Sequence, residues 1–575
     1  MRETQASSQP QQDPRFNLQI ERLGPLPLIN HFIERIGLEA SLERHVPSDA
    51  RCTIPHARAL GVLLRSIIVE REPIYRQQET VHGFAAGMFG IPAQDMEHLS
   101  DDRLGRALDR LFDADRAALL TEVVLAVGER FGVRFDELHN DSTSVSFCGS
   151  YRGASGRTIR GRSAPAITYG HSKAHRPDLK QLLFILTMSA DGNIPVAFRC
   201  TDGNMSDSRT HIQTWHALCA VAGRTDFLYV ADSKLCSREN MDAIERAGGR
   251  FVTVMPRNRL EDREFRLWIQ THVPEWEGVW DRPNPRHRDG PRDGWFVYRA
   301  PLLSAEAWSV VWVWSTLLTL HQEARRRRNI AAASEVLQQL RIRLAGAKAR
   351  LRGAAEIDLQ VKSILDKHYV SRYLKVTRTV REEYLFKQTR RGRPGPGTAY
   401  RKITKRRFDI EWMTDEQAVA YDHKSDGMYP LMTNDRSLSA AQILEAHKGQ
   451  PMIEKRFEQI KTVHEIAPVF LKNEGRIEAL FTLYFLALLV QALIERELRL
   501  AMKRQSIAEL PIYPEQRQCA HPTTEQTLHL FSLAQRHKLT QAGRTLKIFE
   551  TELTPLQQQV LALLGVSQSA FRSKN

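Results

Sequence analysis

The chain has little cysteine. Among its 575 residues the cysteines are Cys52, Cys148, Cys200, Cys219, Cys236 and Cys519. They are scattered and include no C-x-x-C pair, so they provide neither a disulfide framework nor a zinc framework. We expect buried, reduced side chains in a reducing compartment. The chain also lacks a convincing Ser/His/Asp or Cys/His arrangement, which argues against nucleophilic catalysis by a side chain.

Long hydrophobic runs are scarce as well. Residues 1–13 are polar and rich in glutamine, and they lack the apolar core of a signal peptide. The longest near-apolar run, Ala479 to Ile494, would span about 24 Å as a helix, which is less than the ~30 Å core of a bilayer. Gln491 interrupts this run. We therefore predict a buried helix in a cytoplasmic protein without a membrane partner.

Positive charge is present in excess. The chain contains 82 Lys and Arg against 67 Asp and Glu, a formal net charge of +15. Such an excess indicates a polyanionic partner, and charge alone would fit DNA, RNA or an anionic membrane surface. The hydrophobic share of 42% is sufficient for packed cores, and the length predicts several domains.

The first part of the chain, residues 15–132, is predicted to be a helical domain preceded by a disordered tail over 1–14. Apolar residues recur at helical spacing from Ile29 to Ile36, and further helices are expected after Pro55, after Ser100 and near Ala117. DNA-end binding and dimerisation are both open as roles for this domain.

After Gly132 the pattern changes to strands and helices. Strands are predicted over Phe135–Phe147, Gln181–Ser189, Ile194–Phe198, Phe227–Val230 and Phe251–Met255, with helices over 207–223 and 238–247. The order βββαβαβ places Asp141 on the first strand and Asp232 just beyond the fourth. This is the layout of an RNase H-like α/β domain, with a mixed five-stranded sheet and flanking helices.

We therefore predict a catalytic domain built from residues 133–258 and 408–475. A large basic insertion of strands and long helices interrupts it over 259–407, and a helical C-terminal region follows over 476–575. Within the insertion, residues 385–407 carry many basic residues and no acidic one.

The string Arg391-Gly392-Arg393-Pro394 lies inside this basic stretch. Arginines in an extended Gly/Pro frame can enter a narrow A·T minor groove, as in an AT-hook. The alternative is a disordered basic loop that follows phosphates without sequence preference.

A third carboxylate, Glu454, lies on a helix that Pro451 is suited to begin. Glu454 and Lys461 recur at helical spacing and are predicted to share one face. By itself this spacing is typical of an ordinary surface helix. Together with Asp141 and Asp232, however, Glu454 completes a set of three acids on three elements.

Three carboxylates offer the oxygen ligands that Mg²⁺ prefers, with Mn²⁺ as a substitute. Two such cations about 3.5–4 Å apart stabilise both the attacking and the leaving oxygen of an in-line phosphoryl displacement. Asp141, Asp232 and Glu454 are therefore our candidate catalytic and metal-ligating residues.

These motifs resemble the DDE transposases of bacterial insertion sequences, in the insertion sequence four superfamily, whose third acid lies in a tyrosine-x2-arginine-x3-glutamate-x6-lysine signature. The three acids match in His139-Asn140-Asp141-Ser142-Thr143, in Tyr229-Val230-Ala231-Asp232-Ser233 and in Ile453-Glu454-Lys455-Arg456-Phe457. Strings typical of the insertion sequence sixteen-thirty-four branch are Ser100–Gly105, Tyr169–Gln181 and Gly203–Asp207. The resemblance covers roughly residues 20–565.

The chain departs from the signature at two positions, with His447 in the tyrosine place and Gln450 in the arginine place. The resemblance implies that these positions contact DNA phosphate near the cut. For the segment around His171 and His175, nearby basic residues favour phosphate binding or strand-edge structure over a metal site. The predicted DNA-binding residues are Lys461, Arg391, Arg393, Lys173, Arg176, Gln450 and His447.

The resemblance implies metal-dependent endonuclease action at the terminal inverted repeats, followed by attack of the freed 3′ hydroxyl on the opposite strand or on target DNA. It also implies a homodimer in the synaptic complex and a location at the bacterial nucleoid. Two alternatives remain open: a transposase-derived DNA-binding protein that no longer cuts, and an RNase H-like nuclease without joining activity. Relatives stack an extruded base on a tryptophan, and Trp295, Trp308, Trp312 and Trp314 are candidates, although a strand core explains Trp312 and Trp314 equally well.

Overall fold

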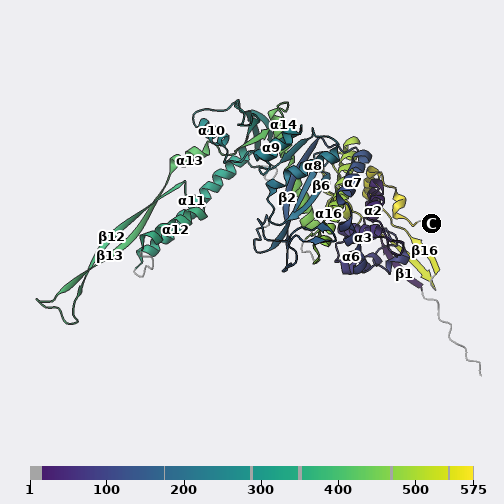
Figure 1. Ribbon diagram of the computed structural model, residues 1–575, viewed down its shortest axis with the longest axis horizontal. Coiled ribbons are helices and arrows are strands. Elements are labelled where there is room, and N and C mark those ends of the chain that lie inside the picture. Colours follow the sequence, from purple (N-terminus) through teal and green to yellow (C-terminus); the bar gives the residue numbers. More distant parts are fainter. Residues whose placement is uncertain are drawn as a thin grey trace, which may run out of the picture. The chain divides into compact units, whose positions relative to one another are not determined.

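The computed structural model describes residues 16–173, 175–284, 289–346, 353–466, 471–541 and 544–573, so the predicted tail over 1–14 lies outside the described residues. The chain divides into two compact units. The first combines Met1–Thr253 with Glu445–Asn575, and the second is Val254–Leu444. The second unit is thus inserted into the sequence of the first (Figure 1).

The sheet of the first unit has its strands in the order β6-β5-β2-β7-β8. Their bounds are β2 Glu137–Phe147, β5 Lys180–Ser189, β6 Pro195–Asp202, β7 Leu228–Ala231 and β8 Arg250–Val254. Strands β2, β5 and β6 pair antiparallel, whereas β7 pairs parallel with both β2 and β8. All five predicted strands and the two helices between them, α8 (His211–Ala222) and α9 (Arg238–Arg246), are present.

One long helix, α16 (Glu474–Arg504), forms the core of the first unit. Asn473 caps it by accepting a hydrogen bond from the Arg476 N–H, and its residues from 479 to 494 are buried. By length and composition α16 could cross a membrane, but 89% of its most apolar window is buried inside the protein. The predicted buried helix is confirmed.

The N-terminal helices are α1 Leu26–Ile36, α2 Leu38–His45, α3 His56–Val69, α4 Gln77–His82, α5 Ala93–Met96, α6 Asp101–Asp113 and α7 Arg116–Phe131. Helices α1, α3 and α6 pack against α16. The four predicted helices correspond to α1, α3, α6 and α7. Gly37 ends α1 with a positive φ of 74°, and the Ser100 side chain caps α6 by accepting from the Arg103 N–H.

Both terminal regions contain strands in addition to helices, which corrects the expectation of purely helical ends. Strand β1 (Phe16–Arg22) pairs with β15 (Gln535–Gln541), and β15 pairs with β16 (Arg544–Phe549). These strands are short and mixed in polarity, and their partners lie more than 500 residues apart in sequence. The C-terminal helices are α17 (Thr524–His529) and α18 (Pro555–Leu564).

The second unit contains strands in the order β14-β11-β10-β9, all antiparallel. They are β9 Glu277–Arg282, β10 Asp293–Arg299, β11 Ser309–Ser315 and β14 Met428–Thr433. Trp312 is 1% exposed and its ring stacks on Phe265 of α10 (Leu260–Trp268) with centroids 3.7 Å apart. Trp295 and Trp308 are also buried, so these side chains serve the core of this unit.

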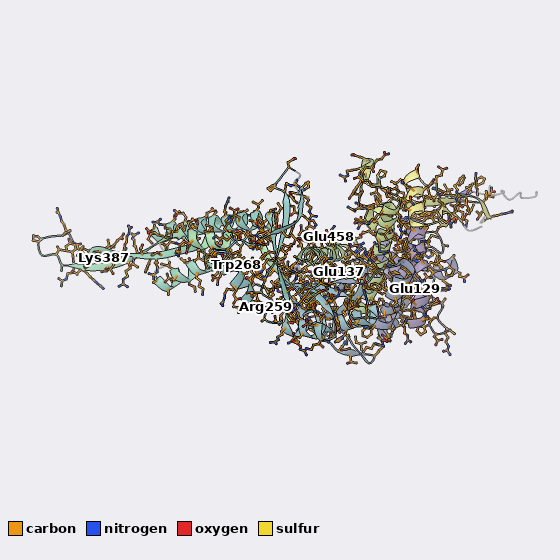
Figure 2. The ribbon with its side chains drawn as sticks, turned by 90° about the horizontal axis from the view of Figure 1, so that it is seen from above. Glu129, Glu137, Arg259, Trp268, Lys387 and Glu458 are labelled. Carbon is orange, nitrogen blue, oxygen red and sulfur yellow. The ribbon has the colours of Figure 1, made fainter. Side chains whose placement is uncertain are left out.

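The long helices expected in the insertion are α11 (Thr316–Ala345) and α12 (Ala354–Lys367). The basic stretch 385–407 belongs to a hairpin of two fifteen-residue strands, β12 (Leu374–Gln388) and β13 (Tyr400–Thr414), and the Arg391-Gly392-Arg393-Pro394 string lies in the loop that joins them. Figures 1 and 2 show this hairpin as a long, narrow ribbon that carries Lys387. Helix α13 (Glu416–His423) follows it.

The remaining elements are short. They are β3 Thr158–Ile159, β4 Arg162–Ser163, η1 Ile74–Arg76, η2 Asp207–Arg209, η4 Pro514–Gln516 and η5 Gln568–Phe571.

Candidate active site

Two of the predicted carboxylates lie on neighbouring parallel strands. In the ladder between β2 and β7, Asn140 is paired with Ala231, so Asp141 and Asp232 each follow the same rung. Both side chains are partly exposed. In α/β folds, ligands commonly bind at the carboxyl ends of parallel strands. This position therefore suits the binding of a charged ligand.

An ion pair holds Asp141 in place, and hydrogen bonds hold Asp232. The Lys173 ammonium lies 3.6 Å from Asp141 Oδ1. Asp232 Oδ1 accepts from the Lys234 N–H at 3.0 Å, and its main-chain oxygen accepts from the Thr253 hydroxyl of β8 at 2.7 Å. The turn after β7 is thereby tied to the next strand.

A buried pair, Tyr229 and His211, lies close to the two aspartates. The Tyr229 hydroxyl is 3.0 Å from His211 Nδ1, and both side chains are buried. Burial, reinforced by the negative charge of Asp232, raises the pKa of Tyr229 well above its usual value. The phenol therefore keeps its proton and adds no negative charge beside the two carboxylates.

The third carboxylate lies on a segment of three short elements. Helix α14 (Ala440–Gly449) is followed by α15 (Pro451–Glu458) and by the π-helical turn η3 (Gln459–Val463). The predicted start of a helix at Pro451 is confirmed, and Glu454 lies exposed in its first turn.

This segment is fixed to β2 at both of its ends. A methyl group on Gly449 would lie only 2.7 Å from His139 Cε1, so the helix backbone rests directly on that ring. At the other end the Lys461 ammonium donates to Thr143 Oγ1 at 2.6 Å. Only a residue without a side chain fits the first of these contacts.

The two contacts place Glu454 over the face of β2 that bears Asp141. His139, Asp141 and Thr143 alternate along the strand, so their side chains point to one face. Glu454 lies between the two attachment points in sequence. The fold therefore puts the helix that carries the third acid on the side of the sheet toward which Asp141 points.

The expected face shared by Glu454 and Lys461 is not a continuous α-helical one. The π-helical turn intervenes, and the His464 N–H donates to the Gln459 carbonyl five residues earlier at 2.9 Å. The wider turn changes the angular spacing that an α-helix would give. π-Helical turns of this kind are frequent at functional sites.

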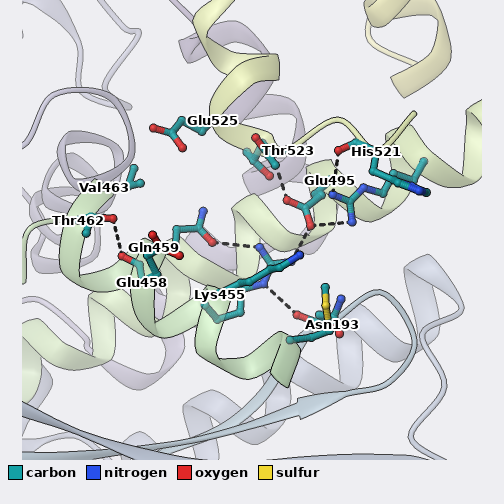
Figure 3. A pocket seen from close by; sticks show the side chains of 14 residues that line it. Asn193, Lys455, Glu458, Gln459, Thr462, Val463, Glu495, His521, Thr523 and Glu525 are labelled. Atoms are coloured by element: carbon teal, nitrogen blue, oxygen red, sulfur yellow. Dashed lines mark hydrogen bonds and ion pairs between the residues drawn. The ribbon is translucent and has the colours of Figure 1, made fainter. Parts of the chain in front are cut away.

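A buried polar network holds α15 and η3 against α16 (Figure 3). Arg456 is buried and pairs with Glu495 of α16 at 3.2 Å, while its guanidinium also donates to the Asn193 carbonyl at 3.3 Å. Gln459 then donates to Gln491 at 3.0 Å. The network lies beside a cavity of about 780 Å³ that none of the three predicted metal ligands lines. It positions the helix rather than forming the site.

The remaining predicted DNA contacts are placed differently from one another. Lys461 is half-buried, and burial together with the Lys173 charge lowers its pKa. Burial also lowers the pKa of His447 to about 4, so this imidazole is neutral near pH 7.

The other predicted DNA contacts differ in exposure. Gln450 is only 8% exposed, whereas Arg176 is exposed and pairs with Asp178 at 2.7 Å. Arg391 and Arg393 belong to the second unit, in the loop that joins β12 and β13.

The two aspartates have the chemistry of a site for a hard divalent cation, since their oxygens are partly exposed and adjacent in register. Across the described ranges, however, no group of three or more His, Cys, Asp or Glu side chains is close enough to hold a metal ion. The fold thus brings together Asp141 and Asp232, and it places Glu454 on the covering helix without closing a three-carboxylate cluster.

Comparison with known families decides the assignment of this domain. Residues 137–490 match the family model described as a transposase DDE domain, which covers more than half of the chain. The chain belongs to the DDE transposases. Residues 18–125 of this transposase match a second family, described as a domain of unknown function. No curated protein gives a significant match.

Membership supports, in general terms, an enzyme that binds, cleaves and transfers DNA, in a family that generally uses divalent metal ions. The spacing of motifs predicted the carboxylates of this transposase, but not Thr143, His211, Tyr229 or the Arg456–Glu495 pair. Only Thr143 had a detectable signal, because it lies two residues beyond Asp141 on the same strand face.

Proposed function

We propose that this transposase cleaves DNA at the terminal inverted repeats of a bacterial insertion sequence and joins the freed ends to target DNA. The observation that carries the proposal is the placement of Asp141 and Asp232 directly after the same rung of two parallel strands, beneath the helix that bears Glu454. All three acids lie within the matched transposase domain.

Asp141, Asp232 and Glu454 would hold Mg²⁺, or Mn²⁺ in its place, through carboxylate oxygens. When bound, such ions supply Lewis-acid activation of water and of the scissile phosphate. Lys461, which donates to Thr143, and Lys173, which pairs with Asp141, attract the DNA phosphate by charge. Tyr229 stays protonated and buried, so the negative charge offered to the cation comes from the carboxylates.

The strand order supports an RNase H-like catalytic domain. Three antiparallel strands are followed by two parallel ones, with the first strand in the middle of the five. The matched glutamate and lysine positions favour the insertion sequence four superfamily and its sixteen-thirty-four branch. In this proposal the enzyme acts at the nucleoid as a homodimer on two element ends, and the family of unknown function at 18–125 contributes to end binding or to dimerisation.

The test is a cleavage and joining assay with purified protein, Mg²⁺ and a plasmid that carries the inverted repeats flanking the gene. Asp141→Asn, Asp232→Asn and Glu454→Gln should each reduce cleavage by at least about a hundredfold, since the loss of a metal ligand removes several kcal/mol of transition-state stabilisation. Binding to the same ends in the absence of metal should persist.

Glu458→Gln is the matched control, because Glu458 is an exposed carboxylate one turn further along α15. It should cleave at the wild-type rate. An aspartate variant that cuts normally would overturn the site. Wild-type protein that binds ends but never cuts would indicate a DNA-binding descendant, and cutting without joined products would indicate a nuclease.

A further inference from the structure

The hairpin β12–β13 has two halves with different surroundings. Its proximal half packs on α11 and α12, with Leu374 and Ile410 buried in a cluster around Leu337 and Leu340. Its distal half, residues 384–405, is exposed on both faces apart from partial burial at Gln388, Thr398 and Ile403. The full register is maintained to Gln388 and Tyr400.

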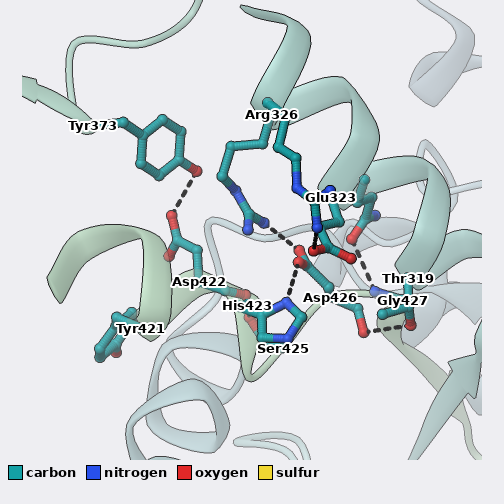
Figure 4. Close-up of polar contacts among 12 residues, drawn as sticks. Thr319, Glu323, Arg326, Tyr373, Tyr421, Asp422, His423, Ser425, Asp426 and Gly427 are labelled. Atoms are coloured by element: carbon teal, nitrogen blue, oxygen red, sulfur yellow. Dashed lines mark hydrogen bonds and ion pairs between the residues drawn. The ribbon is translucent and has the colours of Figure 1, made fainter. Parts of the chain in front are cut away.

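Polar contacts anchor the base of the hairpin within the second unit (Figure 4). Tyr373, just before β12, donates to Asp422 Oδ2 at 2.7 Å. Nearby, the buried side chains of Arg326 and Asp426 form an ion pair. The distal half is therefore a ribbon held at one end, and its own side chains do not fix it to a core.

Charge is distributed unequally between the two halves. Proximal cations are neutralised: Lys375 pairs with Asp415, Arg378 with Asp358, and Arg406 with Glu382. Residues 384–405 contain seven Lys and Arg and no Asp or Glu. Among the described residues, none of these seven pairs with a carboxylate. They are Lys387, Arg390, Arg391, Arg393, Arg401, Lys402 and Lys405.

Aromatic rings accompany these charges. Phe386 is 66% exposed, and Tyr384 and Tyr400 are each 50% exposed. The register puts all three on one face, where the Lys402 ammonium lies 3.6 Å from the centre of the Tyr384 ring. Exposed aromatic rings among unpaired cations are typical of surfaces that bind nucleic acid.

We infer that residues 384–405 form a β-ribbon arm that binds duplex DNA. A two-stranded ribbon fits the major groove, and arginines in the connecting loop can reach phosphates or an adjacent minor groove. The inference rests on the proposed function, because it supplies a second DNA contact for the same enzyme. A second copy of the chain is a poorer partner, since two arms of like charge repel each other along their open strand edges.

The experiment measures DNA binding by the full chain with a short duplex, without divalent metal, over a range of salt concentrations. In the triple variant Arg390→Ala, Arg391→Ala, Arg393→Ala, the slope of log affinity against log salt should fall by about 2–3, since each lost phosphate contact removes ~0.9. Affinity at moderate salt should fall at least about tenfold.

The matched control is Lys375→Ala, Arg378→Ala, Arg406→Ala. It removes the same charge from the same hairpin, but the three cations are already paired. Its slope should change by less than about 1. The triple variant Arg390→Ala, Arg391→Ala, Arg393→Ala (the tip variant) should have the same melting temperature as wild type, because the substitutions remove no contact of these three side chains. An unchanged melting temperature shows that its fold is intact.

The inference would be overturned if the tip variant bound DNA with the wild-type affinity and the wild-type slope of log affinity against log salt. So would a tip variant whose only change is a shift from dimer to monomer. Because binding is measured without metal, a tip variant with weakened binding supports the arm even if the enzyme never cuts. Conversely, normal cleavage with an unchanged slope would leave the proposed function standing and remove the arm.

Discussion

Gly449, the last residue of α14, lies against the His139 ring of β2. In an ordinary helix an alanine would be favoured over glycine by about 1 kcal/mol. Here the added methyl group would lie 2.7 Å from the His139 ring. We expect Gly449→Ala to destabilise the protein by about 1–3 kcal/mol, because the ring or the helix must move.

Chemical denaturation measures this effect, with cleavage as a second readout because the shift would move Glu454 relative to β2. Gly153→Ala is the control, since no atom outside its neighbours lies within 4 Å of its new methyl group. Increased stability in Gly449→Ala would show that the His139 ring yields freely.

Replacing Lys461 distinguishes a role in phosphate binding from a role in metal binding. Its ammonium contacts Thr143 and lies in the field of Asp141. Lys461→Met should weaken DNA cleavage by about tenfold or more, since a charged hydrogen bond is worth ~1.5–3 kcal/mol. Mn²⁺ binding, followed by electron paramagnetic resonance, should be unchanged or tighter, because a positive charge beside the carboxylate is lost. Lys455→Met, exposed on α15, should change neither quantity, and weaker Mn²⁺ binding in Lys461→Met would contradict a phosphate role.

At the scale of the element, η3 depends on a buried histidine. His464 Nε2 donates a hydrogen bond to Gln491 Oε1, and burial lowers the pKa of His464 to about 4. The unfolded chain has a pKa near 6.5, so it binds more protons than the folded chain between these values. Stability from this group is complete above about pH 6.5 and is lost as the pH falls toward 4, by up to about 3 kcal/mol.

Urea unfolding between pH 7 and pH 4 measures this loss. His464→Gln should flatten the pH dependence in that window, whereas His98→Gln, at an exposed position, should leave it unchanged. His447 has a pKa lowered in the same direction, so part of the dependence should remain. An unaltered slope in His464→Gln would assign the effect elsewhere.

Two substitutions test whether α16 is an apolar helix buried inside the protein. Leu486 is 0% exposed, so Leu486→Ala should destabilise the protein by about 2–5 kcal/mol through the cavity it leaves. Leu533 is 89% exposed, and Leu533→Ala should change stability by less than about 0.5 kcal/mol. Thermal unfolding in detergent-free buffer distinguishes the two, and equal small effects would argue against a protein core around α16.

The sequence predicted elements whose cause is local. Gly37, Ser100 and Pro451 set helix ends through their own backbone or side-chain chemistry, and β5 and β7 carry continuous apolar runs. The hairpin β12–β13 was not predicted because its distal residues are largely charged and show no apolar alternation. Their strand structure depends on pairing with the partner strand. The π-helical turn at Gln459 was missed for a related reason, since contacts with β2 and α16 determine it.

The same distinction applies to the candidate site. Asp141 and Asp232 could be predicted because each lies at a definite place on a predicted strand, and parallel pairing then brings them together. The Arg456–Glu495 pair could not be predicted, because its partners are 39 residues apart and become neighbours only when α15 packs on α16. Spacing along one helix or strand therefore predicts candidate metal ligands. The residues that hold those ligands in place are determined by tertiary packing.

At the scale of the whole molecule, the first unit is completed by residues from the far end of the chain. Helix α16 fills its core and β15 pairs with β1. We expect a chain that stops at residue 444 to leave the first unit without a stable fold, whereas the second unit, with its own core cluster, keeps its structure. Limited proteolysis followed by mass spectrometry would show protection only within residues 254–444, and a protected N-terminal fragment would contradict this expectation.

The discontinuous first unit has a consequence during protein synthesis. A ribosome releases Asp141 and Asp232 long before Glu454, with the whole second unit between them, and α16 follows later still. A partly made chain therefore carries Asp141 and Asp232 before α15 and α16 have been made. We expect the proposed cleavage site to stay incomplete until these two helices have been synthesised and have packed on the sheet.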